Sequence, residues 1–270
     1  MAAGYATRLY PLTLGIPKPL LRITRDKTVI DLIVDGLLHT GVVRRITVVT
    51  NHKFSADFNA WARRHAHSRL IHIEDDGTLS NEDRLGAIGD IHYVVTKKKI
   101  EDDVVVVGGD NLFSRPFDGF IRFARQQRPY ASLGLFDIRD KRKAGRFGVV
   151  SVNRDGGVVR FEEKPERPAS TLVATCLYYF PAQTLQDLEV YALDKTTSND
   201  ASGNYIRWLM ERSRVYGLVL KQDHWVDIGH LDSYKQVIAR YNGEIKLRHN
   251  LRNHCRVISS DVSYLPEFDP

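Results

Sequence analysis

The sequence predicts an α/β fold in which helices cover both faces of a central sheet. Strand-like and helix-like patterns alternate through the first 127 of its 270 residues, as in doubly wound folds. The run "DVVVVGGDN" at 103–111 begins with a continuous apolar stretch, typical of a strand buried on both faces. With 43% hydrophobic residues, a chain of this length can form one large domain or two small ones.

The first half of the chain is read from the spacing of its apolar residues. Residues 28–40 place apolar side chains on one helical face, and 45–51 is rich in β-branched residues. Ser55 is of a type that commonly caps helices, so a helix is expected to begin there. The predicted elements are helix 28–40, strand 45–51, helix 55–66, strand 70–75, polar loop 76–85, helix 86–98, strand 103–111 and helix 117–127.

The second half is richer in strands and predicts a lid-like β part of the same domain. Asp155, Gly156 and Gly157 form a turn signal between two of these strands. The predicted elements are strands 130–138, 147–153, 158–164 and 172–180, helices 182–193 and 203–213, strand 215–221 and helix 231–242. No linker interrupts them, so one domain is expected over 1–243, with a tail of unassigned structure at 244–270.

Composition and charge exclude several classes of protein. The net charge is +6, but the basic residues are scattered rather than arranged in a stripe with aromatics, which argues against nucleic-acid binding. The sequence contains no apolar run long enough to span a membrane and no signal peptide. Its two cysteines, Cys176 and Cys255, do not make a disulfide framework, so a cytoplasmic setting is expected. A modest positive charge suits an enzyme that handles phosphates.

The opening stretch, "MAAGYATRLYPLTLGIPKPLL", has the composition of a phosphate-binding loop. Gly4 permits close backbone approach, and N–H groups in such a loop can point at phosphate oxygens. Arg8 and Lys18 add positive charge, and the prolines on either side of Lys18 stiffen the chain. From the residues alone, a basic surface loop is an equally good interpretation.

Acidic residues follow two apolar stretches. Asp110 lies just past the buried strand, where α/β sheets bind ligands, and one or two carboxylates with substrate phosphates suffice for Mg²⁺. A cap on the following turn is the alternative. Asp227, in "HWVDIGHLDSY", is a weaker signal of the same kind. In "FEEKP", Glu163 and Lys164 leave a strand at a proline, and salt-bridged edge residues are the alternative there.

Taken together and in this order, these stretches resemble the sugar-1-phosphate nucleotidylyltransferases, also called NDP-sugar pyrophosphorylases. The resemblance extends from residue 1 to about residue 242. It is carried by "AAGYATRLYPLT", "PKPLL", "VVVGGDNLF", "RFGVV", "FEEKP" and "WVDIGHLDSY".

The resemblance implies a Rossmann-like three-layer fold with a mixed central sheet. It also implies transfer of a nucleoside monophosphate from a nucleoside triphosphate to a sugar 1-phosphate, with release of pyrophosphate. Arg8 and Lys18 would act on the reacting phosphates, and Asp110 and Asp227 would hold Mg²⁺. The implied nucleotide contacts are Ala3, Gly4, Thr7 and Gly86, and the implied sugar-phosphate contacts are Asn111, Gly148, Glu163 and Lys164.

The chain departs from the family pattern at three places, which leaves both substrates unassigned. Ala6 stands where the family often has a second glycine. A glutamine that often contacts the base is absent from 74–90, although Gly86 and Ala87 match the step into the next helix. The glutamate often found before the penultimate helix is absent from 199–206.

Two other activities remain open. One is a cytidylyltransferase for another phosphorylated alcohol, such as phosphocholine, and the other is a non-catalytic regulatory relative. The presence of Arg8, Lys18, Asp110, Lys164 and Asp227 favours a catalytic protein. The sequence lacks the hexapeptide repeats of a C-terminal β-helix, so oligomerisation through such a helix is not expected, while another homo-oligomer stays open.

The resembled family also leads to an expectation about the first strand. In that family a short apolar strand leads directly into the Ala-Ala-Gly step, whereas here Met1 stands at the place of its last residue. We therefore expect this strand to be missing and the natural chain to begin about five to eight residues earlier, from typical strand lengths.

Overall fold

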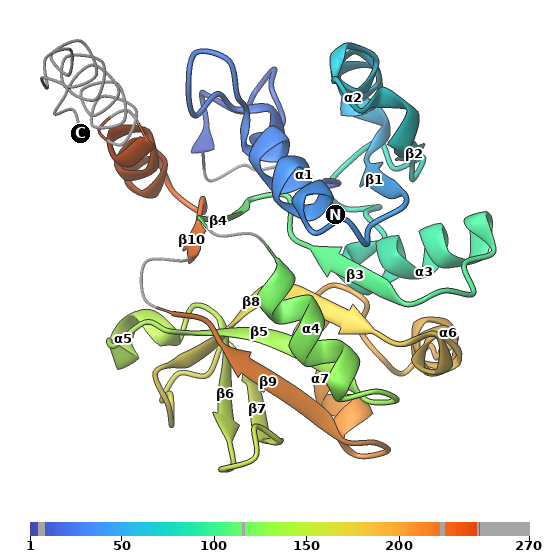
Figure 1. Ribbon diagram of the computed structural model, residues 1–270, viewed down its shortest axis with the longest axis vertical. Helices are drawn as coiled ribbons and strands as arrows, with labels where there is room; N and C mark the ends of the chain where they lie inside the picture. Colours follow the sequence, from blue (N-terminus) through green and yellow to red (C-terminus); the bar gives the residue numbers. More distant parts are fainter. Residues whose placement is uncertain (5–8, 115–116, 222–224, 242, 244–270) are drawn as a thin grey trace, which may run out of the picture.

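The computed structural model describes residues 1–4, 9–114, 117–221, 225–241 and 243 (Figure 1). In this part of the chain the main sheet has six strands. They are β3 (Val104–Val107), β5 (Ala131–Asp137), β6 (Gly148–Val152), β7 (Val158–Glu163), β8 (Leu172–Phe180) and β9 (Val215–Val219). The order β7-β6-β8-β5-β9 forms a continuous path, and β3 also pairs with β8.

The long strand β8 organises this sheet. On one side it pairs antiparallel with β5, and on the other it pairs with β6 at Val173 and with β3 from Leu177 to Phe180. Strand β5 pairs in parallel with β9, so the sheet is mixed, as expected. Because β8 and β3 are neighbours, the β-rich second half completes the main sheet instead of forming a lid-like part.

A second, parallel pair consists of β1 (Ile46–Thr50) and β2 (Ile71–Asp75). The first residues of the chain lie between this pair and the main sheet. The Ala2 N–H donates to the Val49 carbonyl at 2.9 Å, and the Met1 amine donates to the Val107 carbonyl at 3.0 Å. These bonds bring the carboxyl ends of β1 and β3 to the same edge, where α/β sheets bind ligands.

Helices cover both faces of the main sheet, which confirms the three-layer fold. Successive side chains of a strand point to opposite faces. Accordingly, Leu177 and Tyr179 pack in one apolar cluster with α1, α2 and α4, and Tyr178 and Phe180 pack in another with α3, α6 and α7. The helices are α1 (Val29–His39), α2 (His52–Arg64), α3 (Gly86–Lys98), α4 (Asp118–Gln126), α5 (Lys141–Ala144), α6 (Leu185–Leu193) and α7 (Ser202–Met210).

Helix α2 begins earlier than the sequence predicted. Asn51 is its N-cap, and the Asn51 side chain accepts a hydrogen bond from the Phe54 N–H at 3.2 Å. Asparagine and serine are both good N-caps, and the prediction chose Ser55, which lies inside the helix, instead of Asn51. The Asn51 amide also donates to the Ala3 carbonyl at 2.9 Å, so this cap fastens the opening segment to β1 and α2.

The predicted strand 103–111 is broken at its end. Strand β3 ends at Val107, the chain turns at Gly109 and Asp110, and a separate strand β4 (Asn111–Phe113) pairs antiparallel with β10 (Trp225–Asp227). The turn matters because it presents Asp110 between the two strands. The hairpin predicted at Asp155–Gly157 joins β6 to β7, with Gly156 at φ 80°.

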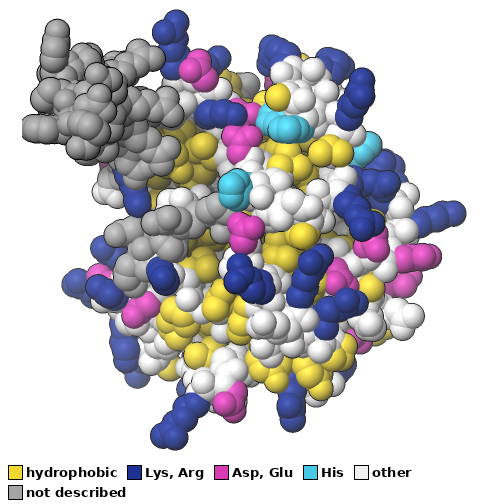
Figure 2. All heavy atoms as spheres, in the orientation of Figure 1, with side chains coloured by type: hydrophobic (Ala, Val, Ile, Leu, Met, Phe, Trp, Pro, Cys, Tyr) yellow, Lys and Arg dark blue, Asp and Glu magenta, His cyan; other side chains and the backbone are white. Residues whose placement is uncertain are grey.

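The last described helix covers residues 231–241, and Val237 from it joins the cluster that contains α1. The tail at 244–270 lies outside the described residues. Among the described helices, none is both long and apolar enough to cross a membrane. On the face shown in Figure 2, the Lys and Arg side chains are spread over many elements instead of forming one stripe.

Candidate active site

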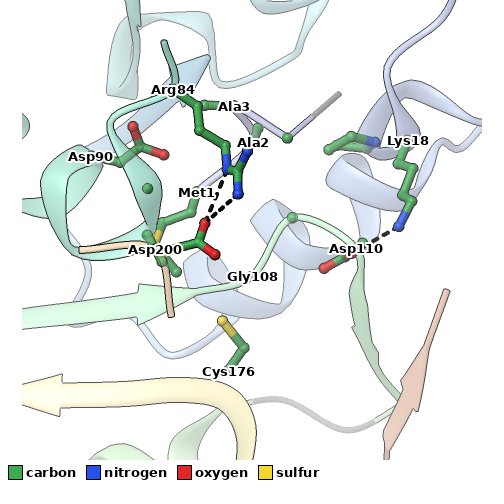
Figure 3. Close-up of a pocket in the computed structure, with 15 residues that line it drawn as sticks. Met1, Ala2, Ala3, Lys18, Arg84, Asp90, Gly108, Asp110, Cys176 and Asp200 are labelled. Atoms are coloured by element: carbon green, nitrogen blue, oxygen red, sulfur yellow. Dashed lines mark hydrogen bonds and ion pairs between the residues drawn. The ribbon is translucent and has the colours of Figure 1, made fainter. Parts of the chain in front are cut away.

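A cavity of about 270 Å³ opens at the edge where β1 and β3 end (Figure 3). Its walls come from the opening segment, from the 3₁₀ helix η2 (Lys18–Leu20), from the start of α3 and from the turn after β3. Of the residues expected at the nucleotide and the metal, it brings together Ala3, Gly4, Lys18, Gly86 and Asp110.

The opening segment lies along one wall of the cavity. Ala3 is buried, and its carbonyl is held by Asn51. No described atom lies within 4 Å of the position that a Cβ on Gly4 would take, so the space beside Gly4 is open. Thr7 and Arg8 lie outside the described residues, and their expected phosphate contacts stay predictions.

Lys18 is buried at the cavity wall between Pro17 and Pro19. Its ammonium Nζ lies 3.2 Å from Oδ2 of Asp110, and only 9% of its side chain is exposed. A buried ammonium needs a nearby anion because removing it from water is costly. In this structure that anion is the Asp110 carboxylate.

Asp110 is held on two sides. Its Oδ1 accepts from the Asn111 side-chain amide at 2.9 Å, while Oδ2 faces Lys18. The Asn111 Oδ1 accepts in turn from the indole Nε1 of Trp225 at 2.7 Å. Asn111 is therefore buried between β4 and β10, where it orients Asp110, and its expected contact with a sugar phosphate stays a prediction.

Asp227 comes from the strand beside Asp110. It lies opposite Asn111 in the β4–β10 register, and the following Ile228 N–H donates to the Asp110 carbonyl at 2.9 Å. Burial, together with the negative charges of Asp110 and Asp227, raises the pKa of the Cys176 thiol to about 12. Asp110 thus lines the cavity, whereas Asp227 lies outside its lining, on the strand that pairs with β4.

This pair of carboxylates fits Mg²⁺ in one respect. Mg²⁺ is commonly bound through one or two carboxylates together with substrate phosphates, and it keeps several waters. Within the described residues, no group of three or more His, Cys, Asp or Glu side chains could form a cage made by the protein alone. The donor set thus suits an ion that arrives with phosphates.

Gly86 forms the opposite wall, where only glycine fits easily. Its φ is 79°, in the region that favours glycine, and a Cβ there would lie 2.4 Å from the Asn199 carbonyl oxygen. The Ala87 and Ile88 N–H groups donate to the carbonyls of Asp200 and Asn199 at 3.2 and 3.0 Å. The 199–200 segment thus binds the first turn of α3 and closes this wall.

Three residues expected at the sugar phosphate lie together outside the cavity lining. Gly148 pairs with Glu163 in the β6–β7 register, and a Cβ on Gly148 would lie 2.5 Å from the Phe161 ring. Burial raises the pKa of Glu163, partly opposed by Lys164, whose Nζ lies 3.7 Å away. The structure therefore groups Gly148, Glu163 and Lys164, and their contacts with a sugar phosphate stay predictions.

Four cavity residues did not emerge from the sequence. They are Arg84, Asp90, Cys176 and Asp200. Arg84 and Asp200 form an ion pair between two loops that are far apart in the chain, with Nη2 2.9 Å from Oδ1. Asp90 could have been found from the sequence, because it follows Gly86 by four residues and residues four apart in a helix lie on the same face.

Comparisons with known proteins agree with this geometry. A family model described as nucleotidyl transferase matches residues 1–244. A glucose-1-phosphate adenylyltransferase from Fervidobacterium nodosum is 23% identical over 244 residues, covering 87% of this chain and 58% of that protein. One from Trichlorobacter lovleyi is 25% identical over 297 aligned residues, covering 98% and 70%.

Another glucose-1-phosphate adenylyltransferase, from Clostridium perfringens, is 27% identical over 148 residues, and the chain covers only 37% of its length. A solved structure described as a glucose-1-phosphate thymidylyltransferase from Bacillus anthracis, in complex with sucrose, has a TM-score of 0.72. It is 20% identical, with 88% of this chain and 92% of that chain covered, and it therefore supports the fold. Since the family model matches almost the whole chain, the chain belongs to the nucleotidyl transferase family.

Proposed function

We propose that this protein transfers a nucleoside monophosphate from a nucleoside triphosphate to a sugar 1-phosphate. The observation that carries the proposal is the buried Lys18–Asp110 pair at the edge where β1 and β3 end, with Asp227 on the neighbouring strand. The printed names of the relatives, which act on glucose 1-phosphate, support the same class of acceptor.

In the proposed reaction, an oxygen of the sugar phosphate attacks the α-phosphorus of the triphosphate. A new oxygen–phosphorus bond forms, the bond to the β-phosphate breaks, and pyrophosphate leaves with the electron pair. Most of the protein's work in such a step is positioning and stabilisation of charge. Lys18 would contribute an ammonium at the reacting phosphates.

Asp110 and Asp227 would hold Mg²⁺ when the triphosphate is bound. The ion supplies neutralisation of the charge that develops on the phosphate oxygens. Asn111 keeps the Asp110 carboxylate oriented through its 2.9 Å hydrogen bond. At the other substrate, Glu163 would accept from sugar hydroxyls and Lys164 would pair with the sugar phosphate.

The test is a matrix of substrates with pyrophosphate release as the readout. ATP, GTP, CTP, UTP and dTTP are each combined with several sugar 1-phosphates and, separately, with phosphocholine. We expect release that needs both a triphosphate and a sugar 1-phosphate, and that Asp110→Asn abolishes. Pyrophosphate release from a triphosphate with phosphocholine, but with none of the sugar 1-phosphates, would support the cytidylyltransferase alternative. Binding of a triphosphate without pyrophosphate release in any combination would support a non-catalytic protein.

A further inference from the structure

The cavity has two chemically different ends. Lys18 and Asp110 lie at one end, and Arg84, Asp90 and Asp200 lie at the other, beside the Gly86 wall (Figure 3). If the triphosphate occupies the Lys18 end, as the proposed function requires, its base lies toward the other end. The polar side chains there are then the groups that can distinguish one base from another.

Asp90 is the unusual residue at this end. It lies in the second turn of α3, lines the cavity, and is only 6% exposed. Its Oδ1 and the Oδ2 of the neighbouring Asp76 are both buried and receive no hydrogen bond from any described N–H group, and the two carboxyls can bond to each other only when one of them is protonated. A carboxyl that lines a ligand cavity and receives no N–H donor from the described protein can accept one from a ligand.

The electrostatics of Asp90 point the same way. Burial, together with the negative charge of Asp76 and a hydrogen bond to it, raises the pKa of the Asp90 carboxyl to about 7. The charge of the Met1 amine partly opposes this shift, but no described N–H group donates to the carboxylate. A ligand that brings N–H groups to Asp90 would supply what the protein leaves out.

Arg84 provides the complementary group. Its Nε and Nη2 bind Oδ1 of Asp200 at 3.0 and 2.9 Å, and its Nη1 donates to the Asn81 carbonyl at 2.6 Å. A guanidinium has five N–H donors, so donors remain for a ligand. This end of the cavity therefore offers a carboxyl that lacks donors beside a guanidinium that has donors to spare.

Guanine matches this pattern best among the common bases. Its outer edge carries two adjacent donors, N1–H and the 2-amino group, followed by the carbonyl O6. Uracil and thymine place one N–H between two carbonyls, and adenine and cytosine each present one amino group next to an acceptor. Building on the proposed function, we propose that Asp90 is a specificity-determining residue that accepts from the base edge and makes GTP the preferred triphosphate, with Arg84 facing O6.

The test measures binding of triphosphates to the full chain in the presence of Mg²⁺, by calorimetry and without an acceptor. GTP is compared with ITP, which lacks only the 2-amino group, and with ATP, CTP, UTP and dTTP. Loss of a hydrogen bond to a charged group predicts that ITP binds about tenfold to a hundredfold more weakly than GTP. This comparison uses the unmodified protein, so it does not depend on whether a variant folds.

The Asp90→Asn variant then tests whether Asp90 is the residue that causes the preference for GTP. We expect GTP to lose at least about tenfold in affinity, from the same hydrogen-bond strength, with ATP little changed. Glu82→Gln is the matched control, because it makes the same change of charge at an exposed position in the preceding loop. Its ratio of GTP to ATP affinity is expected to equal that of the unmodified protein.

The outcomes separate this proposal from the proposed function. Preferred binding of any triphosphate other than GTP, or equal binding of GTP and ITP, overturns the role of Asp90 and leaves the transfer reaction standing. Failure of all the triphosphates to bind overturns the transfer reaction itself.

Discussion

The Lys18 ammonium lies 3.2 Å from Oδ2 of Asp110, although the two residues are 92 positions apart in the chain. The same carboxylate is the one proposed to hold Mg²⁺, so the ammonium and the ion would compete for it. Binding of the ion with a triphosphate would release Lys18 from Asp110 toward the phosphates. The pair thus keeps both groups in place before the substrate arrives, with neither charge buried alone.

Replacing either carboxylate tests the proposed metal site. Asp110→Asn and Asp227→Asn should each lower turnover by about a hundredfold or more, because stabilisation of the reacting phosphates by a metal is worth several kcal/mol. Pyrophosphate release measured against Mg²⁺ concentration is the readout. The exposed Asp102→Asn serves as the control. Full activity of either site variant at low Mg²⁺ would remove that residue from the metal site.

Lys18 and Lys164 should affect different substrates. Lys164→Ala should raise the KM for the sugar 1-phosphate about tenfold to a hundredfold, whereas Lys18→Met should mainly lower kcat and weaken use of the triphosphate. Steady-state kinetics with each substrate varied in turn would separate the two effects. Identical responses of both variants to both substrates would contradict the assignment of separate sites.

The proposed role of Arg8, which comes from the sequence resemblance alone, can be tested by the same comparison of the two substrates. Arg8→Ala should damage use of the triphosphate about tenfold to a hundredfold while the KM for the sugar 1-phosphate stays close to normal. The measurement is the same kinetic series. A variant whose only defect is toward the sugar 1-phosphate would move Arg8 to the other half of the site.

Gly86→Ala tests the wall of the cavity. The substitution places a methyl group at φ 79° and 2.4 Å from the Asn199 carbonyl oxygen, so the free energy of unfolding should fall by about 1–3 kcal/mol. Gly119→Ala, in the first turn of α4, is the control, because no described atom lies within 4 Å of the added Cβ. Urea denaturation of both variants measures their free energies of unfolding. Equal values would show that the 199–200 segment moves to accommodate the added methyl group at little cost.

The fold and part of the site could be predicted from local patterns in the sequence. The buried strand, the hairpin at Gly156 and most helices depend on apolar periodicity and turn residues, which are local properties. The break after Val107 could not be predicted in this way, because it depends on the Gly109 N–H donating to the Met1 carbonyl at 2.8 Å and on pairing of β4 with β10. Apolar run length carries no information on those distant partners.

The ordered motifs predicted the residues of the phosphate end, and the structure brings Lys18 and Asp110 into contact. The other end was missed because its groups become significant only through tertiary contacts. Arg84 and Asp200 are ordinary loop residues until the fold pairs them, and Asp90 is ordinary until burial isolates its carboxyl from donors. The same three residues carry the proposal about the base, which the motifs left open.

The pKa of Asp90 predicts a pH dependence of stability that does not require a substrate. Burial and Asp76 raise this pKa from 3.8 to about 7, with the Met1 amine opposing the shift. In the unfolded chain the carboxyl ionises near its ordinary pKa, so between about pH 4 and pH 7 the unfolded state binds fewer protons than the folded state. Stability should therefore fall as pH rises through this range and change no further above it.

Asp90→Asn removes this titration while keeping the shape of the side chain. Each unit of pKa shift corresponds to about 1.4 kcal/mol. The difference in free energy of unfolding between the variant and the unmodified protein should therefore shift in favour of the variant by on the order of 2–3 kcal/mol from about pH 5 to about pH 8. Urea denaturation at the two pH values measures this, with Glu82→Gln, whose side chain is exposed, as the control. If the difference between Asp90→Asn and the unmodified protein is the same at both pH values, Asp90 ionises normally in the folded state. The free carboxyl would then already have a donor, and the reason for reserving it for a base would be lost.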